Sequence, residues 1–378
     1  MPSLLPGFAS SIIEIWSATY SLRGVDPLIA NSSPTPRLWR IRGRGRGDTA
    51  LQRTSVESLN LGMDTVMTHR AFGRHAARAL QAVRQEAARL EGMLSRFIPE
   101  SEISKINGSA GHACCSVSPE AYAVLLFATE LSAACQGMFD VTIGPLVDLW
   151  SIGHGALRPP ADAQIRRALS LVNYRDLLLD PVRRTAGLRR AGQSVDLGGI
   201  GKGYAADRFI QVFREYGVSS AFTNIGGNVA ALGARPDGSA WRVGIQHPRQ
   251  PDALIGLVSV EDKAVVTSGD YQRFFDDGEG NRYHHILDPT TGYPSRSGLA
   301  GATVVAGCSG NGSMVADALS TAVFIAGLDR GLALISRYPG VGALFVDAES
   351  TDAGLSVWVT PNLIDCFSAA QGVSVHVA

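Results

Sequence analysis

The sequence predicts an α+β fold in which mixed sheets pack against helices. Predicted strands gather in the later part of the chain, between residues 221 and 360, and helices are inserted among them. The regular alternation of strands and helices that a doubly wound sheet requires is missing. Apolar residues make up 45% of the 378-residue chain, so we expect a sizeable core, in two domains or in one large domain with insertions.

The composition argues against several classes of protein. Lys and Arg (34) balance Asp and Glu (34), so nothing favours nucleic acid as a partner. The five cysteines are odd in number and lack CxxC spacing, which indicates neither a disulfide framework nor a zinc site. No apolar run approaches the roughly 18–20 residues of a membrane span. The first apolar patch lacks an early basic residue and is interrupted by Glu14, so it does not resemble a secretory signal.

Residues 1–55 are predicted to form an N-terminal extension, and residues 56–378 the folded unit. The extension alternates Arg and Gly between Arg37 and Gly47 and shows no sustained helix or strand period. Two interpretations remain, a basic tail for nucleic acid or membrane and a disordered segment, and we favour disorder. No cysteine precedes Cys114, so a lipid anchor on an N-terminal cysteine is not expected, and a cytoplasmic location is the default expectation.

The part of the chain after the extension is predicted to begin with one strand and three helices. Residues 59–73 alternate as in a strand, and residues 74–97 carry an apolar stripe at helical spacing. A turn and a short helix are expected over residues 99–108. The next helix, over residues 118–136, begins with Ser118 as its N-cap and a proline in its first turn.

The later elements are mainly strands. We expect a hairpin over residues 183–195, a helix over 205–216, and two strands around a Gly-Gly turn over 221–232. Further strands are expected at 241–245, 255–260 and 264–268, spaced as in an antiparallel meander, and then at 302–306, 343–347 and 356–360. A last helix over 313–327 is expected to end at Gly327.

The stretch over residues 194–208 has the composition of a site for an anionic, phosphorylated ligand. Asp196 leaves a predicted strand, three glycines follow, and Lys202 opens a helix. Backbone N–H groups at the start of a helix favour negative charge, and a lysine adds a point charge. The stretch is not a Walker motif, because Gly203 and not Ser or Thr follows the lysine. A tight strand-to-helix connection without a ligand is the alternative interpretation.

The helix predicted over residues 313–327 carries two polar side chains on one face. Asp317 and Thr321 are one turn apart in an otherwise apolar segment. A carboxylate and a hydroxyl that project together suit Mg²⁺, which takes oxygen ligands. In the alternative interpretation, Asp317 caps or solvates the helix start and Thr321 bonds back to a carbonyl of its own helix.

Two further places hold candidate functional side chains. Adjacent histidines, His284 and His285, point to opposite sides if they lie in a strand, and one of them could act as a general base near pH 7. Asp140 lies within an apolar stretch, where an unpaired carboxylate would be costly. It therefore either accepts local N–H groups or faces a ligand.

Eight motifs occur in an order that resembles the ApbE family of FAD:protein FMN transferases, over about residues 59–365. The motifs are MDT at 63–65, SRF at 95–97 with SEIS at 101–104, GMFDVT at 137–142, VDLGGIGKGYAAD at 195–207, NIGGN at 224–228, SGDY at 268–271, HILDPTTGYP at 285–294 and ADALSTA at 316–322. The resemblance implies a T-fold-related α+β fold with a cleft for FAD between its subregions.

The resemblance also implies an activity and a set of site residues. The family binds FAD and Mg²⁺ and passes FMN to a Ser or Thr hydroxyl of a target flavoprotein, with loss of AMP. Its metal ligands correspond to Asp317, Thr321 and the backbone carbonyl of Gly199, and its base for the acceptor hydroxyl corresponds to His285. Its FAD contacts correspond to Met63, Phe97, Met138, Phe139, Asp140, Asp196, Lys202 and Ile286.

Two other activities would use the same residues. With water as the acceptor, the site would be an FAD pyrophosphatase that gives FMN and AMP. A non-catalytic FAD-binding protein is the third possibility, but it would not need Asp317, Thr321 or His285, and all three are present. Many members of the family are exported, whereas this sequence shows no lipobox cysteine.

We expect the N-terminal extension to be dispensable for folding and for FAD binding, because it lacks periodic apolar residues. A chain that starts near Leu59 should keep its melting temperature and its affinity for FAD. Differential scanning fluorimetry and flavin titration of the two chains check this. A loss of several degrees on truncation would show that the extension packs on the core.

Overall fold

The computed structural model describes residues 55–155, 158–348 and 354–378. The predicted extension therefore lies outside the described residues, except for Ser55. Ser55 begins strand β1 (Ser55–Gly62), which pairs along its whole length with β2 (Thr65–Phe72). A start at Leu59 would cut this strand in half, so the truncated chain in the test above should begin at Ser55.

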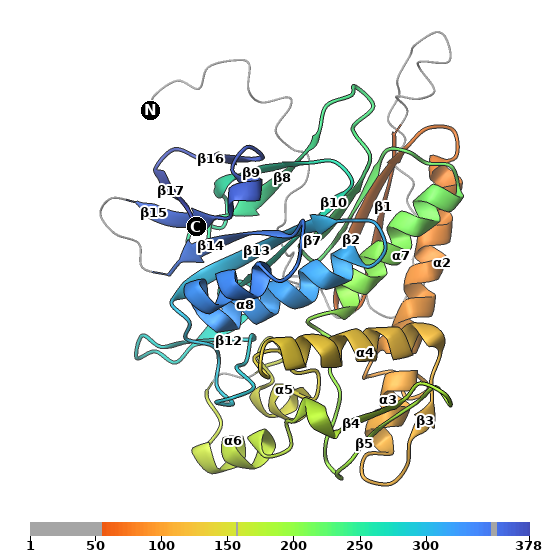
Figure 1. Cartoon of the computed structure of the whole chain (residues 1–378), viewed down its shortest axis with the longest axis vertical. Helices are drawn as coiled ribbons and strands as arrows, with labels where there is room; N and C mark the ends of the chain where they lie inside the picture. The colour runs from red at the N-terminus through yellow and green to blue at the C-terminus, as the bar shows by residue number, and fades with distance from the viewer. Residues whose placement is uncertain (1–54, 156–157, 349–353) are drawn as a thin grey trace.

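A nine-stranded sheet forms the centre of the molecule, in the order β1-β2-β6-β7-β10-β13-β14-β15-β17 (Figure 1). Neighbouring strands are antiparallel, except for the parallel pair β15 and β17. The remaining strands of this sheet are β6 (Ala221–Ile225), β7 (Asn228–Leu232), β10 (Lys263–Gly269), β13 (Leu299–Gly307), β14 (Gly342–Asp347), β15 (Leu355–Val359) and β17 (Val373–Val377).

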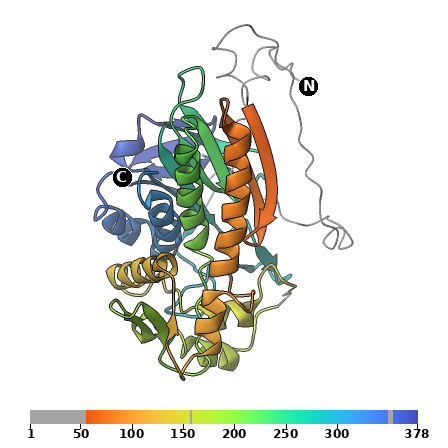
Figure 2. The ribbon, with the colours of Figure 1, turned by 90° about the vertical axis from the view of Figure 1, so that its right-hand side faces the viewer.

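Both faces of the large sheet are covered. Three helices pack on one face (Figures 1 and 2), namely α2 (Ala76–Leu94), α7 (Gly201–Glu215) and α8 (Gly312–Ile335). The other face packs against a small sheet of β16 (Phe367–Ala369), β9 (Leu254–Val260) and β8 (Trp241–Gln246). This second core is built around Trp241, whose side chain is fully buried.

A smaller subregion lies beyond the end of the large sheet (Figure 1). It consists of α3 (Glu102–Gly108), α4 (Pro119–Ala134), α5 (Gly144–Trp150), α6 (Asp162–Leu169), the short 3₁₀ helix Tyr174–Asp176, and a sheet of β3 (Cys115–Ser116), β5 (Thr185–Leu188) and β4 (Leu177–Asp180). The hairpin of β11 (Phe274–Asp276) and β12 (Arg282–His284) reaches this subregion, where Phe275 and Leu287 share a core with Trp150. A second 3₁₀ helix, Pro361–Leu363, follows β15.

The fold class and most of the predicted elements are confirmed, but several local predictions are wrong. Residues 59–73 form a hairpin and not one strand, because Met63 and Asp64 both adopt the left-handed conformation (φ 52° and 57°) that a two-residue turn requires. The predicted hairpin at 183–195 is shifted toward the N-terminus, since it is β4 and β5 that pair. The predicted meander is broken: β8 and β9 pair, but β10 joins the large sheet between β7 and β13.

Helix α8 is the longest apolar element. Among the described residues, it alone is long and apolar enough to cross a membrane by length and composition. From the sequence, no apolar segment of this length is predicted, and the helix is predicted to end at Gly327. The backbone does leave helical geometry at Gly327 (φ 78°), but the helix then continues to Ile335. Contacts with β10 and β13 and with α7 bury its apolar side chains, as in the core helix of a sheet protein.

Where helices α7 and α8 cross, each supplies a carboxylate that accepts hydrogen bonds from backbone amides in the first turn of the other. Asp207 of α7 accepts hydrogen bonds from the first amides of α8, Ser313 N (2.9 Å) and Met314 N (2.8 Å). In return, Asp317 Oδ2 of α8 accepts from Gly203 N (2.8 Å) in the first turn of α7. Each carboxylate satisfies amides that have no partner within their own helix. A Cβ on Gly203 would lie 2.3 Å from the carbonyl oxygen of Ser313, so the two backbones touch at this glycine.

We expect Gly203→Ala to destabilise the protein by about 1–3 kcal/mol or more, because backbone atoms of α8 cannot move aside as a flexible side chain would. Gly92→Ala is the matched control. Gly92 lies in α2 with nothing near its missing Cβ, so alanine there should leave stability unchanged or raise it by up to about 1 kcal/mol. Urea unfolding of both variants gives the comparison. Equal stabilities would contradict the close contact.

Candidate active site

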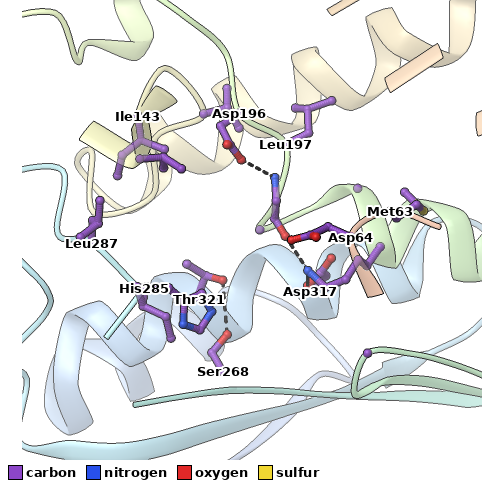
Figure 3. Close-up of a pocket in the computed structure, with 18 of the residues that line it drawn as sticks. Met63, Asp64, Ile143, Asp196, Leu197, Ser268, His285, Leu287, Asp317 and Thr321 are labelled. Atoms are coloured by element: carbon purple, nitrogen blue, oxygen red, sulfur yellow. Dashed lines mark hydrogen bonds and ion pairs between the residues drawn. The ribbon is translucent and has the colours of Figure 1, made fainter. Parts of the chain in front are cut away.

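A cavity of about 360 Å³ lies between the large sheet with its helices and the smaller subregion. It is formed where the β1–β2 turn, the β6–β7 turn and the end of β10 meet the loops of the smaller subregion. All the predicted site residues line it, and Figure 3 labels Met63, Asp196, His285, Asp317 and Thr321 among them. The full set is Met63, Phe97, Met138, Phe139, Asp140, Asp196, Gly199, Lys202, His285, Ile286, Asp317 and Thr321.

The glycine-rich stretch before α7 is a loop that side-chain hydrogen bonds hold in place. Asp196 Oδ1 accepts a hydrogen bond from Gly198 N (2.7 Å), which closes a tight turn, and Asp196 Oδ2 lies 2.8 Å from Arg96. The predicted strand before it is absent, and residue Ser194 makes only a single bridge, to Ile143. Lys202 sits in the first turn of α7, and its ammonium donates to Gly198 O (2.5 Å). The hydrogen bond to Gly198 O thus holds the positive charge of Lys202 at the cavity wall.

Asp317 is a buried carboxylate at this wall. Burial raises its pKa, and the opposing effects that favour its charge come from the Lys202 ammonium, the Gly203 amide and the Asn228 side chain. The distance from Lys202 Nζ to Asp317 Oδ1 is 4.0 Å. Because Asp207 satisfies the first amides of α8, Asp317 does not cap its own helix, and that alternative is wrong.

The oxygen atoms around Asp317 are of the kind that Mg²⁺ prefers. Thr321 lies one turn further along α8, and a Cβ on Gly199 would stand 3.4 Å from Thr321 Oγ1, so the Gly199 backbone runs beside this hydroxyl. Carboxylate, hydroxyl and peptide carbonyl are hard ligands. Among the residues that the structure describes, there is no group of three or more His, Cys, Asp or Glu that could hold a metal. A cation here would therefore need oxygens from a bound substrate to complete its shell.

The two adjacent histidines have different surroundings, although only His284 lies in a strand, because β12 ends there and His285 follows it. His284 is buried, donates from Nε2 to Ser295 O (2.9 Å) and accepts from Ile286 N at Nδ1 (3.3 Å), so both ring nitrogens are used. His285 lines the cavity, and its Nδ1 faces Arg273 O (3.3 Å). A carbonyl can only accept, so Nδ1 carries the proton and Nε2 keeps its lone pair.

Burial lowers the pKa of His285 to about 3, with smaller contributions from the charges of His284, Arg273 and Lys202. The ring is therefore neutral at pH 7. A neutral ring with a lone pair at Nε2 can accept a proton.

The other predicted contacts surround the cavity in different ways. Asp140 accepts from Thr142 N (2.8 Å) and Tyr174 N (2.7 Å), which is the local arrangement expected of a carboxylate in an apolar stretch. Burial still raises its pKa. Phe97 is 71% exposed, with the Arg96 guanidinium 5.5 Å from its ring centre, whereas Ile286 is buried.

Some residues of the cavity wall have no role in the sequence analysis. Arg96 bridges Asp196 and Asp148 (2.6 Å), and Arg273 holds Asp64 at the β1–β2 turn by Nη1 to Oδ2 (2.6 Å). These partners are 52 to 209 positions apart in the chain, so no local pattern could have paired them. Arg96, Asp64 and Ser268 belong to the SRF, MDT and SGDY motifs, so the motifs could have singled out these residues, although not their partners.

Comparison with known proteins agrees with this geometry. Residues 63–345 match the model of the ApbE family. The chain is 35% identical to a FAD:protein FMN transferase of Klebsiella pneumoniae over 72% of this chain and 81% of that protein. It is 34% identical to one of Treponema pallidum, over 75% and 82%. A crystal structure of the Pseudomonas stutzeri flavinyl transferase ApbE, apo form, superposes with a TM-score of 0.71 at 30% identity, over 84% of this chain and 98% of that one. The chain therefore belongs to the ApbE family.

Proposed function

We propose that this chain is a Mg²⁺-dependent enzyme that transfers FMN from FAD to a Ser or Thr hydroxyl of an acceptor flavoprotein, forming a phosphoester and releasing AMP. That the chain is a flavin transferase follows from family membership and from relatives named FAD:protein FMN transferase. One observation most strongly supports Mg²⁺-dependent transfer to a hydroxyl. It is the buried Asp317 carboxylate beside Thr321, Gly199 and Lys202, in one cavity with His285.

The binding of FAD is assigned to the cavity wall. Lys202 and the amides of the glycine turns would hold the diphosphate, because backbone N–H groups and an ammonium favour phosphate oxygens. Phe97, exposed at the cavity, offers a ring face for stacking, and Met138, Phe139, Ile286 and Met63 supply apolar contact.

Asp317, Thr321 and the Gly199 carbonyl would hold the metal ion. Bound there, Mg²⁺ would neutralise charge on the diphosphate of FAD. The protein contributes one full negative charge to this site, from Asp317, whose burial makes an uncompensated carboxylate unfavourable. Lys202 Nζ at 4.0 Å and the Gly203 amide compensate this charge in part, and a cation next to Asp317 would relieve the remaining cost, which is why this buried carboxylate fits a metal ligand.

In the transfer step, the acceptor oxygen attacks the phosphorus of the FMN half, and the bond from that phosphorus to the bridging oxygen breaks, so that AMP leaves. His285 Nε2 receives the proton of the attacking hydroxyl. Arg273 O fixes the required tautomer through Nδ1.

The test of the activity is incubation of the full chain with FAD, Mg²⁺ and a candidate acceptor protein. Flavin fluorescence of the acceptor band in a denaturing gel, with the mass increase of FMN, is expected. Free FMN and AMP without a labelled acceptor would instead indicate a pyrophosphatase. Bound but intact FAD would indicate a non-catalytic binding protein.

We expect Asp317→Asn to raise the Mg²⁺ concentration needed for half-maximal transfer steeply, or to abolish transfer. Asparagine can still accept from Gly203 N, so the fold should be kept, but the site loses its full negative charge. Thr321→Val should show a milder effect, because a hydroxyl is neutral. Titration of Mg²⁺ against transfer rate for the three proteins measures this. Superimposable curves for wild type and Asp317→Asn would exclude the metal site.

We expect His285→Asn to lower the rate of transfer by about 10²–10⁴ while FAD affinity stays within a few-fold, because the substitution removes the base and keeps a polar side chain. Single-turnover transfer and flavin titration separate the two effects. A transfer rate equal to that of wild type would assign the proton to another group. Asp288 is the next carboxylate along the chain, but it is a less suitable base than His285, because its Oδ1 already accepts hydrogen bonds from Thr290 N and Thr290 Oγ1.

A further inference from the structure

A row of three hydroxyl groups connects the predicted metal ligand Thr321 to the backbone of α8. Thr321 Oγ1 lies 3.3 Å from Ser268 Oγ at the end of β10, as Figure 3 shows. Ser268 Oγ lies 2.9 Å from Ser320 Oγ, and Ser320 Oγ lies 2.8 Å from Asp317 O. Ser320 is fully buried, so this row ends inside the protein and begins at the cavity.

Each hydroxyl pair taken alone could be donated from either side, but all three contacts can be hydrogen bonds at once in only one direction, which the last member of the row sets. Asp317 O is a carbonyl and can only accept, so the proton of Ser320 is donated to it. A hydroxyl has one proton, so Ser320 must accept from Ser268, and Ser268 must in turn accept from Thr321. The proton of Thr321 is thereby turned toward Ser268. The lone pairs of Thr321 Oγ1 are left for a cation.

We propose that Ser268 and Ser320 are positioning residues that prepare Thr321 as a metal ligand by fixing the direction of its hydroxyl proton. The proposal rests on the proposed function, because it concerns the same metal site. Neither serine needs to touch the ion. Partners that orient a metal ligand are commonly worth 10- to 100-fold in metal affinity.

The row predicts that removing the Ser320 hydroxyl changes the hydrogen bonding of Thr321. When Ser320 is replaced by alanine, Ser268 loses its acceptor, and its proton becomes free to turn toward Thr321 Oγ1. The hydrogen bond between Ser268 and Thr321 then reverses, and a lone pair of Thr321 is taken up by Ser268. A buried residue with no contact to the cavity thus acts on the ligand through two hydroxyls.

The experiment measures binding of Mn²⁺ by the decrease of its free electron paramagnetic resonance signal. The full chain is saturated with ADP, which carries a diphosphate but no flavin half to transfer. Because ADP itself binds Mn²⁺, the curve for the same ADP without protein is subtracted. We expect Ser268→Ala and Ser320→Ala to raise the dissociation constant for Mn²⁺ about 10-fold or more. Ser268→Thr, which keeps the hydroxyl, should restore near wild-type affinity.

A double-mutant cycle separates this action from simple loss of stability. The variant with both serines replaced should bind Mn²⁺ as Ser268→Ala does, because Ser320 acts only through Ser268. In a Thr321→Val background, Ser268→Ala should change nothing further. Additive effects in either cycle would overturn the proposal.

Ser132→Ala is the matched control. Ser132 is fully buried in α4 and donates to Ala128 O (2.7 Å) of its own helix, as Ser320 does in α8, but it is remote from the cavity lining. It should lose similar thermal stability and keep its affinity for Mn²⁺. Wild-type affinity in Ser268→Ala and Ser320→Ala would overturn the hydroxyl row alone. Failure of the wild type to bind Mn²⁺ would overturn the metal site and the row together.

Discussion

The contact between α7 and α8 at Gly203 is the constraint on which the site depends. Only a glycine allows the first turn of α7 to lie against the backbone of α8. This approach brings the Lys202 ammonium to within 4.0 Å of Asp317 and lets the two helices satisfy each other's free amides through Asp207 and Asp317. Charges that would be costly to bury separately are thus held together by the packing of two helices.

The antiparallel sheet supplies the rest of the cavity at one of its ends. The β1–β2 turn, the β6–β7 turn and the last residues of β10 lie at the same end, because Met67 pairs with Ile225 and Val266 pairs with Asn228. Strand ends carry turns, and turns tolerate the polar and left-handed residues that a site needs. The loops of the smaller subregion close the cavity from the opposite side, which explains why residues from nearly the whole chain meet there.

The sequence predicts which residues line the cavity better than it predicts which residues pair with each other or how the strands are ordered. Local signals such as the Gly-Gly turns, the spacing of Asp317 and Thr321, and the motif order identified residues that do line one cavity. The hairpin turn at Met63 and Asp64 is not predicted, since Met63 is an uncommon left-handed residue and the alternation continues across the turn, although Asp64 is of a type that favours such turns. Ion pairs such as Arg273 with Asp64 depend on tertiary packing, and no periodicity encodes a partner 209 positions away. The strand order also escaped prediction, because β9 and β10 are adjacent in sequence but belong to different sheets.

The double use of Asp317 restricts how this lineage can lose its activity. The same carboxylate accepts a hydrogen bond from the Gly203 amide and faces the cavity, so most substitutions of Asp317 also leave a buried amide without a partner. An inactive descendant that drifted at this codon would therefore tend to be cleared by proteolysis before it could acquire a new role. Asparagine, which still accepts from the amide, offers the gentlest path, and a degenerate paralogue that persists in a genome is expected to carry it.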